Sequence, residues 1–181
     1  LVGLFALALT IGLGATVVSA QKNPMVGGAE MYATKNIVEN AINSKDHTTL
    51  VAAVKAAGLV DTLMSAGPFT VFAPTNEAFD KLPAGTVDTL LKPENKATLT
   101  KILTYHVIAG NFSAKDVVAA IKKGNGTAEF TTVAGGKLKA SFDGKSVILT
   151  DEKGGKARVT IADVKQSNGV IHVIDSVVLP N

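Results

Sequence analysis

Two different periods of hydrophobic positions divide the chain. In the first part, apolar residues recur at helical spacing, as in the stripe of Leu50, Val54 and Ala57. From Thr127 onward apolar and polar residues alternate, which is typical of strands with one buried face. Helices therefore come first and a meander of strands follows. This order predicts an α+β domain with one core rather than a series of βαβ units.

The first part predicts several short helices, and most have a recognisable start or stop. Gly58 follows its helix at the position of a C-terminal glycine, and Asp46 is placed to cap the start of that helix. Ser113 and Asp116 have the spacing of a capping box. The expected helices cover residues 36–43, 46–57, 59–64, 85–91, 93–103 and 113–121.

The second part predicts five strands joined by glycine-containing turns. Asp143-Gly144 is a strong hairpin signal, and Gly154-Gly155 marks another turn. The run after Asn168-Gly169 is almost continuously apolar, as in a central strand. The expected strands cover residues 130–133, 138–142, 147–150, 158–162 and 170–178.

The segment Thr70–Pro83, with the sequence TVFAPTNEAFDKLP, connects the two kinds of structure. Thr70–Phe72 predicts a short strand, and Pro74 is expected to end it because proline has no N–H for a sheet hydrogen bond. Thr75-Asn76 then offers side-chain oxygens that cap the start of a helix. We expect the rest of the chain to pack around this corner.

Three segments resemble the fasciclin domain family. Thr70–Pro83 resembles its first signature box, Thr104–Val107 its Tyr-His motif, and Asn168–Pro180 its closing box. The motifs occur in the family's order, and the similarity extends roughly from Tyr32 to Pro180. The resemblance implies a wedge-shaped β-sandwich with a packed helical layer. The chain is similar to secreted bacterial proteins with a single fasciclin domain, some of them associated with symbiosis or known as mycobacterial antigens.

The N-terminal residues predict export. Leu1–Ala20 is uncharged and apolar, and Val18-Ser19-Ala20 resembles a signal-peptidase site. We interpret residues 1–20 as a signal peptide whose basic n-region is missing. A membrane anchor is the alternative, since about 20 apolar residues suffice to span a bilayer. The remaining chain then has a flexible segment, residues 21–33, and a single domain, residues 34–181, with no membrane span after cleavage. We expect it to be secreted, periplasmic or on the cell surface.

Composition argues against several kinds of binding site. The chain has no cysteine, and its net charge is only +3. Arg158 is the sole arginine, and the lysines are dispersed, so a nucleic-acid partner is not expected. The three histidines, His47, His106 and His172, lie far apart, and we interpret His47 as an exposed residue near a helix start. We therefore expect neither a metal site nor a cofactor.

The sequence also lacks the patterns of common enzymes. It has no G-x-S-x-G motif, and its serines lack a recognisable Ser-His-Asp context. The glycine-rich segments 124–126 and 135–137 match neither a P-loop nor a dinucleotide-binding fingerprint, and turns explain them better. We therefore expect no catalytic activity.

Tyr105-His106 is the most suggestive pair, and it has two interpretations. His106 is either a neutral core histidine that donates a hydrogen bond, for which Thr75-Asn76 is a candidate acceptor, or part of a binding surface. The second interpretation comes from the family, in which the neighbourhood of the Tyr-His motif is implicated in receptor binding. The family's Asp-Ile adhesion dipeptide is matched here by Asp116-Val117. The candidate binding residues are thus Thr75, Asn76, Tyr105, His106 and Asp116.

The leading functional hypothesis is a non-enzymatic adhesion or interaction module. Its partner would be a cell-surface or extracellular-matrix protein or glycan, with weak self-association as a further option. We expect the binding surface to be polar and loop-borne, or to be a groove beside Thr70–Pro83. The alternative is a carrier of a small apolar ligand, carotenoid- or lipid-like, in an aliphatic cleft.

Overall fold

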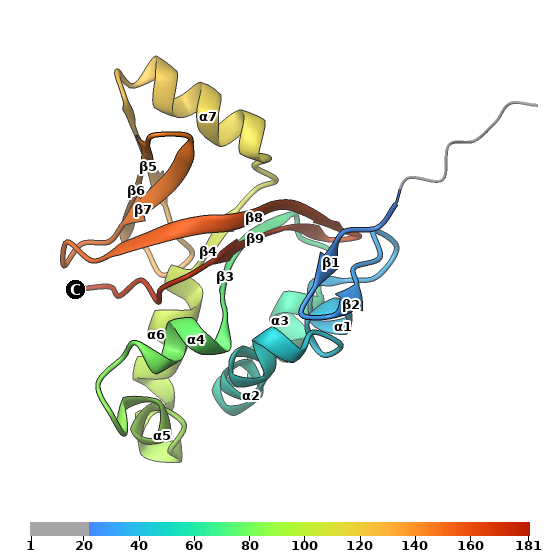
Figure 1. Ribbon diagram of the computed structural model, residues 1–181. Coiled ribbons are helices and arrows are strands. Elements are labelled where there is room, and N and C mark those ends of the chain that lie inside the picture. Colours follow the sequence, from blue (N-terminus) through green and yellow to red (C-terminus); the bar gives the residue numbers. More distant parts are fainter. Residues whose placement is uncertain (1–21) are drawn as a thin grey trace, which may run out of the picture.

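The computed structural model describes residues 22–181, so the predicted signal peptide lies outside the described residues. None of the helices in this part of the chain is both long and apolar enough to cross a membrane. The described chain has helices in its first part and strands in its second, as the sequence predicts (Figure 1). The α+β fold class is therefore confirmed.

The helices agree with the predicted set to within a few residues. Gly58 ends its helix in a left-handed conformation with φ of 71°, and Pro93 occupies the first position of a 3₁₀ turn. The helical elements are α1 (Ile37–Ala41), η1 (Lys45–His47), α2 (Thr48–Ala57), α3 (Val60–Met64), α4 (Asn76–Asp80), α5 (Thr86–Leu90), η2 (Pro93–Asn95), α6 (Lys96–Tyr105) and α7 (Ala114–Lys123).

Most strands form one mixed sheet in the order β4-β3-β9-β8-β7-β6-β5, and β1 and β2 form a separate hairpin. The strands β5 to β9 follow one another as the predicted antiparallel meander. Their bounds are β1 (Met25–Val26), β2 (Ala29–Glu30), β3 (Phe69–Pro74), β4 (Val107–Ala109), β5 (Thr127–Thr131), β6 (Lys137–Asp143), β7 (Ser146–Thr150), β8 (Lys156–Gln166) and β9 (Gly169–Ile174).

Strand β3 joins the two halves of the chain. It pairs in parallel with β9, so that Thr70 lies opposite Val170 and Pro74 opposite Ile174. On its other side β3 pairs with β4, which follows the Tyr-His motif directly. The three segments that resemble signature motifs are therefore neighbours in the sheet. All six residues of β9 are buried, as expected for a central strand.

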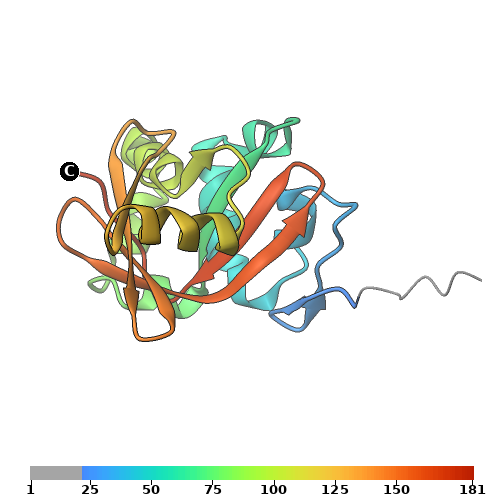
Figure 2. The ribbon, with the colours of Figure 1, turned by 90° about the horizontal axis from the view of Figure 1, so that it is seen from above.

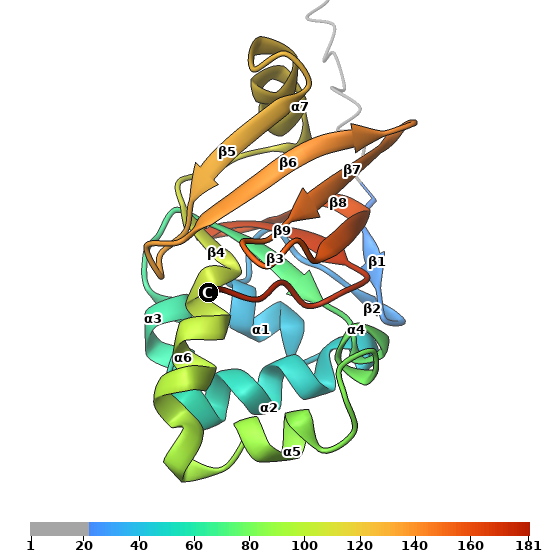
Figure 3. The ribbon, with the colours of Figure 1, turned by 90° about the vertical axis from the view of Figure 1, so that its left-hand side faces the viewer.

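The apolar interior consists of two clusters on opposite faces of the sheet. Successive side chains of a strand point to opposite faces, so Val71 and Ala73 of β3 lie in the first cluster and Phe72 in the second. Helices α1, α2, α3 and α6 cover the first cluster, whereas α7 covers the second (Figure 3). This helical layer on a curved sheet is the wedge-shaped arrangement that the resemblance implies.

The N-terminal segment, predicted to be flexible, contains the β1–β2 hairpin. Val26 and Met31 are only 4% and 2% exposed and belong to the first cluster. The N–H of Lys45 donates to the carbonyl of Gly27 at 3.1 Å. Gly27 has φ of 59°, and a Cβ there would lie 2.3 Å from Ser44 Oγ, so only glycine allows this close approach. These contacts hold the hairpin on the domain.

Three local predictions were wrong, and each has a physical reason. Asp46 does not cap α2, because it lies inside η1 and the N–H of Thr49 bonds Asn76 instead. β3 is longer than the predicted Thr70–Phe72 and includes Pro74 as its last residue, because the neighbouring Thr75 supplies the N–H that bonds the carbonyl of Ile174. β9 ends at Ile174, short of the predicted Val178, and beyond it Val177 and Val178 pack into different apolar clusters while the N–H of Leu179 bonds the Asp151 side chain.

Candidate functional site

Tyr105 is completely buried at the end of α6. Its hydroxyl donates to the carbonyl of Lys137 at 2.6 Å and accepts from the N–H of Glu152 at 3.2 Å. A Cβ on Gly136 would lie 2.7 Å from the ring, so the β5–β6 turn passes directly against it. Burial raises the pKa of Tyr105 to about 12. This hydroxyl is therefore a neutral bridge from α6 to the start of β6 and to the turn between β7 and β8.

His106 has both ring nitrogens paired in the interior. Nε2 accepts a hydrogen bond from the N–H of Val178 at 3.2 Å, so the ring proton lies on Nδ1, 2.8 Å from the carbonyl of Ile102. Burial lowers the pKa of His106 to about 4, so the ring is neutral at ordinary pH. The expectation of a neutral core histidine is confirmed, but the suggested hydrogen bond to Thr75-Asn76 is wrong.

Thr75 and Asn76 organise the corner between β3 and α4. Thr75 Oγ1 accepts the N–H of Ala78 at 3.2 Å and thus caps α4 as predicted. The Asn76 side chain accepts from the N–H of Thr49 at 3.0 Å and donates to the carbonyl of Lys45 at 2.8 Å. Their polar atoms therefore connect α4 with η1 and α2.

Asp116 lies at the start of α7, on the opposite side of the sheet from this corner (Figure 1). Seen from above, α7 lies in front of the strands (Figure 2). Its carboxylate accepts from the N–H and the hydroxyl of Ser113, which completes the predicted capping box. The same hydrogen bonds lower the pKa of Asp116. Val117 is only 3% exposed, so the dipeptide Asp116-Val117 exposes its polar member alone.

The five candidate binding residues are thus not gathered into one site. Tyr105 and His106 lie in the interior, Thr75 and Asn76 at one corner, and Asp116 at a helix start on the opposite side of the sheet. Tyr105, His106 and Asn76 use their polar atoms to connect neighbouring elements, whereas Thr75 and Asp116 cap the starts of their own helices. Their part in binding remains a proposal.

The other two histidines are also buried. His172 accepts the N–H of Asp163 at Nδ1 and approaches the carbonyl of Phe112 through Nε2 at 2.8 Å. His47 is 3% exposed, so its predicted exposed position was wrong, and it pairs with Ser44 Oγ at 2.8 Å. Burial lowers the pKa of both rings. Within residues 22–181, no group of three or more potential ligand side chains gathers to hold a metal.

An exposed polar groove lies on the face of the sheet that is turned away from α7. Cross-strand partners share a face. Ala157 of β8 belongs to the cluster under α7, so its neighbour Arg158 points to the other side. The groove has a volume of about 380 Å³. We call it the Arg158 groove, and its lining includes Ser141, Asp143, Ile148, Lys156, Arg158, Asp175 and Ser176.

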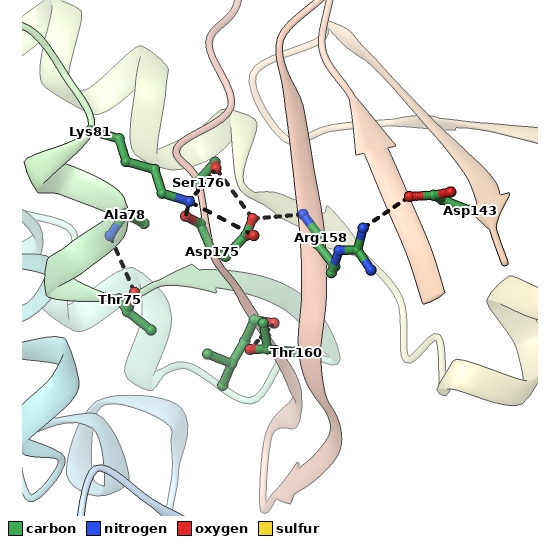
Figure 4. A network of polar contacts seen from close by, with 9 residues as sticks. Thr75, Ala78, Lys81, Asp143, Arg158, Thr160, Asp175 and Ser176 are labelled. Atoms are coloured by element: carbon green, nitrogen blue, oxygen red, sulfur yellow. Dashed lines mark hydrogen bonds and ion pairs between the residues drawn. The ribbon is translucent and has the colours of Figure 1, made fainter. Parts of the chain in front are cut away.

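Charged side chains cross this groove in a chain of contacts (Figure 4). The Arg158 guanidinium donates to Asp143 Oδ2 at 2.9 Å and to Ser146 Oγ at 3.1 Å. Its backbone N–H donates to Asp175 Oδ1 at 2.8 Å. On the far side, Lys81 Nζ donates to the carbonyl of Asp175 at 2.6 Å. The groove therefore ends against the corner that carries the first signature box.

Sequence reasoning singled out none of these side chains as binding residues. The unique arginine was visible, and Asp143 was recognised only as part of a turn. Asp175 lies in the closing segment that resembles a family motif, and Lys81 lies in the first one. The approach of Lys81 depends on the pairing of β3 with β9, which no local pattern reveals. The approach of Asp143 to Arg158 depends on the exact register of β6, β7 and β8, which the predicted meander leaves open.

Two apolar spaces bear on the carrier hypothesis. The cleft between β3 and helices α1 to α3 has a volume of about 40 Å³, far below the 300 Å³ or more typical of ligand pockets. A groove of about 370 Å³ runs under α7 over Phe72, Val147 and Val159, and Lys145 stands at its edge. The groove under α7 is the more spacious of the two.

Comparison with known proteins identifies the family. The profile described as Fasciclin domain matches residues 45–180. Protein sll1483 from Synechocystis sp. is 48% identical over 177 residues, covering 97% of this chain and 91% of the relative. Cell surface glycolipoprotein MPB83 from Mycobacterium bovis is 34% identical over 175 residues, covering 94% of this chain and 72% of the relative.

The fold comparison agrees. The chain superimposes with a TM-score of 0.70 and 20% identity on a FAS1 domain pair from the insect cell adhesion molecule Fasciclin I. The match covers 80% of this chain and 51% of the insect chain, so this chain spans about half of that pair. Together with the matched profile, this confirms the resemblance found in the three sequence motifs: the chain belongs to the fasciclin domain family.

Proposed function

We propose that this protein is a non-catalytic adhesion or interaction module that acts outside the cell. Its partner is a cell-surface or extracellular-matrix protein or glycan, bound at the Arg158 groove. The observation that carries the proposal is the contrast between polar groups that are paired in the interior and charged groups that are open to solvent in the groove. The interior residues Tyr105 and His106 have their polar atoms paired, whereas the groove presents charges to solvent beside the first signature box.

Family membership supports the adhesive role. The insect relative in the fold comparison is a cell adhesion molecule, and MPB83 is named a cell surface glycolipoprotein. A secreted, periplasmic or cell-surface location fits these relatives and the predicted signal peptide. A non-catalytic role fits the neutral state of the buried His106 and His172, because neither ring has a free nitrogen to exchange a proton with a substrate.

The test is adhesion itself. The full chain, expressed for export and purified, is offered to cells and to surfaces coated with matrix protein or glycan, with heat-denatured protein as the control. We expect binding of the native protein that Arg158→Met reduces. Binding that is equal for native and denatured protein on every surface would contradict the proposal. Sedimentation of the same preparation tests weak self-association.

A carrier of a small apolar ligand is the second candidate, and the groove under α7 favours it. Its walls include Val117, Val147 and Val159, and its volume of about 370 Å³ is within the usual range for ligand sites. Native mass spectrometry of protein purified from its own source tests this function. A co-purifying ligand that Val147→Glu displaces would support it, and a bare chain would count against it.

A further inference from the structure

We propose that the Arg158 groove binds uronate-bearing saccharides, with the ligand carboxylate taking the place of Asp143 on the Arg158 guanidinium. This inference rests on the proposed function and assigns a chemical class to its partner. The groove offers the three components that such a ligand needs: a planar cationic fork, hydroxyl and carboxylate groups beside it, and a rigid floor.

The floor is rigid because its residues occupy paired positions on three strands. Ser141 of β6 lies opposite Ile148 of β7, which lies opposite Arg158 of β8. One step along, Asp143 lies opposite Ser146. Cross-strand partners point to the same face, so these side chains form two adjacent rows. Sites built on strands hold their geometry more closely than sites built on loops.

Arg158 is held at its backbone while its side chain remains open. Its N–H donates to Asp175 Oδ1 at 2.8 Å, and its carbonyl accepts from the Asp175 N–H at 3.1 Å. The guanidinium contacts only Asp143 and Ser146 among the described residues, so several of its five N–H donors are free for a ligand. Arginine is otherwise absent from the chain, and its fork matches a carboxylate better than lysine does.

Asp143 occupies the position that a ligand carboxylate would take. Its side chain is 66% exposed, and that of Arg158 is 46% exposed. Ion pairs this exposed contribute little to stability, because water screens them. An incoming carboxylate therefore displaces Asp143 at small cost and restores the same charge-assisted hydrogen bond. Asp143 acts as an internal competitor for the ligand.

The rest of the groove favours a saccharide over an acidic peptide. Asp175 and the hydroxyls of Ser141 and Ser176 lie beside the guanidinium, and Lys81 and Lys156 flank them. Sugar hydroxyls donate to a carboxylate and accept from ammonium groups, so this mixture of signs suits them. The side chains of an acidic peptide carry carboxylates but no hydroxyl donors for Asp175. The groove volume of about 380 Å³ accommodates a short saccharide segment.

The experiment compares three probes with the purified full chain: an oligogalacturonate, its carboxyl-reduced counterpart and a polyglutamate peptide of similar charge. Binding is measured by titration calorimetry at low and physiological salt. We expect the oligogalacturonate to bind, and the reduced saccharide and the peptide to bind at least about tenfold more weakly, which corresponds to the loss of one good charge-assisted contact.

Four variants sharpen the test. Arg158→Met should weaken oligogalacturonate binding about tenfold or more. Arg158→Lys should weaken it by most of the same factor, because lysine keeps the charge but lacks the planar fork. Asp143→Asn should strengthen binding about two- to fivefold, since it removes the competitor. Lys123→Met, an equal charge loss at the end of α7 on the other side of the sheet, should change it less than about twofold. Thermal unfolding verifies that each variant is folded.

The outcomes separate this inference from the proposed function. If the protein adheres to cells but does not bind oligogalacturonate, or if Arg158→Met binds it normally, the uronate assignment is overturned and the adhesive function stands. Equal binding of polyglutamate would replace the saccharide with an acidic protein partner and likewise overturn the assignment. Failure of the native protein to adhere to any surface and to bind any probe overturns both.

Discussion

The Tyr105-His106 interior and the Arg158 groove use polar groups in opposite ways. In the interior, the tyrosine hydroxyl and both imidazole nitrogens are paired with backbone groups. In the groove, the guanidinium has one exposed carboxylate and one hydroxyl as partners among residues 22–181, which leaves further donors open. Paired and buried polar groups stabilise a unique packing, whereas open charges on a rigid surface are available to another molecule. Tyr105-His106 therefore stabilises the packing of the domain, and the binding surface that we propose at the Arg158 groove has no local sequence signature.

The largest effect is expected from His106→Ala. It leaves the N–H of Val178 and the carbonyl of Ile102 unpaired in the interior and also creates a cavity. We expect the free energy of unfolding to fall by about 3 to 4 kcal/mol. Urea unfolding measures it, with Lys123→Met as the surface control. Near-normal stability combined with lost adhesion would reverse the comparison and place His106 in the binding surface.

Lowering the pH should reduce the free energy of unfolding almost as much as His106→Ala does. His106 has a normal pKa of about 6.5 in the unfolded chain and about 4 in the fold, so protons bind the unfolded chain first as the pH falls. Its contribution is complete above pH 6.5 and is lost progressively down to about pH 4, by roughly 3 kcal/mol. The lowered pKa values of His47 and His172 act in the same direction.

Urea unfolding at several pH values between 7.5 and 4.5 measures this loss, and NMR titration of the imidazole signals assigns it. Adhesion that depends on the Arg158 groove should change little over the upper part of this range, where arginine stays charged and the protein stays folded. An imidazole of His106 that titrates near pH 6.5 in the folded protein would contradict the buried, neutral ring.

Tyr105→Phe separates the hydroxyl from the packing of the ring. The ring remains, but the carbonyl of Lys137 and the N–H of Glu152 lose their shared partner. We expect a loss of about 1 to 2 kcal/mol in the free energy of unfolding. Phe72→Leu, in the same apolar cluster but without a polar atom, is a useful comparison because it changes packing alone. An unchanged free energy of unfolding for Tyr105→Phe would contradict a stabilising role of the hydroxyl bridge.

The interior was predictable where its signals were local. The capping box of Ser113 and Asp116, the glycine after α2 and the Asp143-Gly144 turn all specify structure within a few residues, and the helices and hairpins followed. The buried, neutral character of His106 also followed from its position between a helix and a strand. Its partner did not, because the N–H of Val178 comes from 72 residues further along the chain.

The groove was not predictable for the same reason. Arg158, Asp143 and Asp175 come from two different strands and from the segment after a third, and the sheet alone brings them together. The cap of α2 is similar: Asp46 has the right residue type and sequence position, but Asn76 reaches the helix from another element. Patterns in sequence describe local geometry, and these sites depend on pairing between distant segments.

Asn76→Ala tests the corner that lies between the two regions. The variant loses the acceptor for the N–H of Thr49 and the donor to the carbonyl of Lys45. Because the corner is partly solvated, we expect a loss of about 1 kcal/mol in the free energy of unfolding, which is typical of a helix cap. Asn76→Asp keeps the acceptor for the N–H of Thr49 and should recover part of the lost free energy of unfolding. A loss as large as that of His106→Ala would mean that the corner belongs to the interior.

The smallest effect on stability is expected in the groove. Arg158→Met removes contacts to Asp143 and Ser146 that are exposed to solvent, while the backbone hydrogen bonds with Asp175 remain. We expect the free energy of unfolding to change by less than about 0.5 kcal/mol. Urea unfolding of Arg158→Met and of His106→Ala under the same conditions compares the two losses in free energy directly. A loss of several kcal/mol would show that Arg158 holds the strands together as the buried pair does, and the distinction between a stabilising interior and an open binding surface would no longer hold.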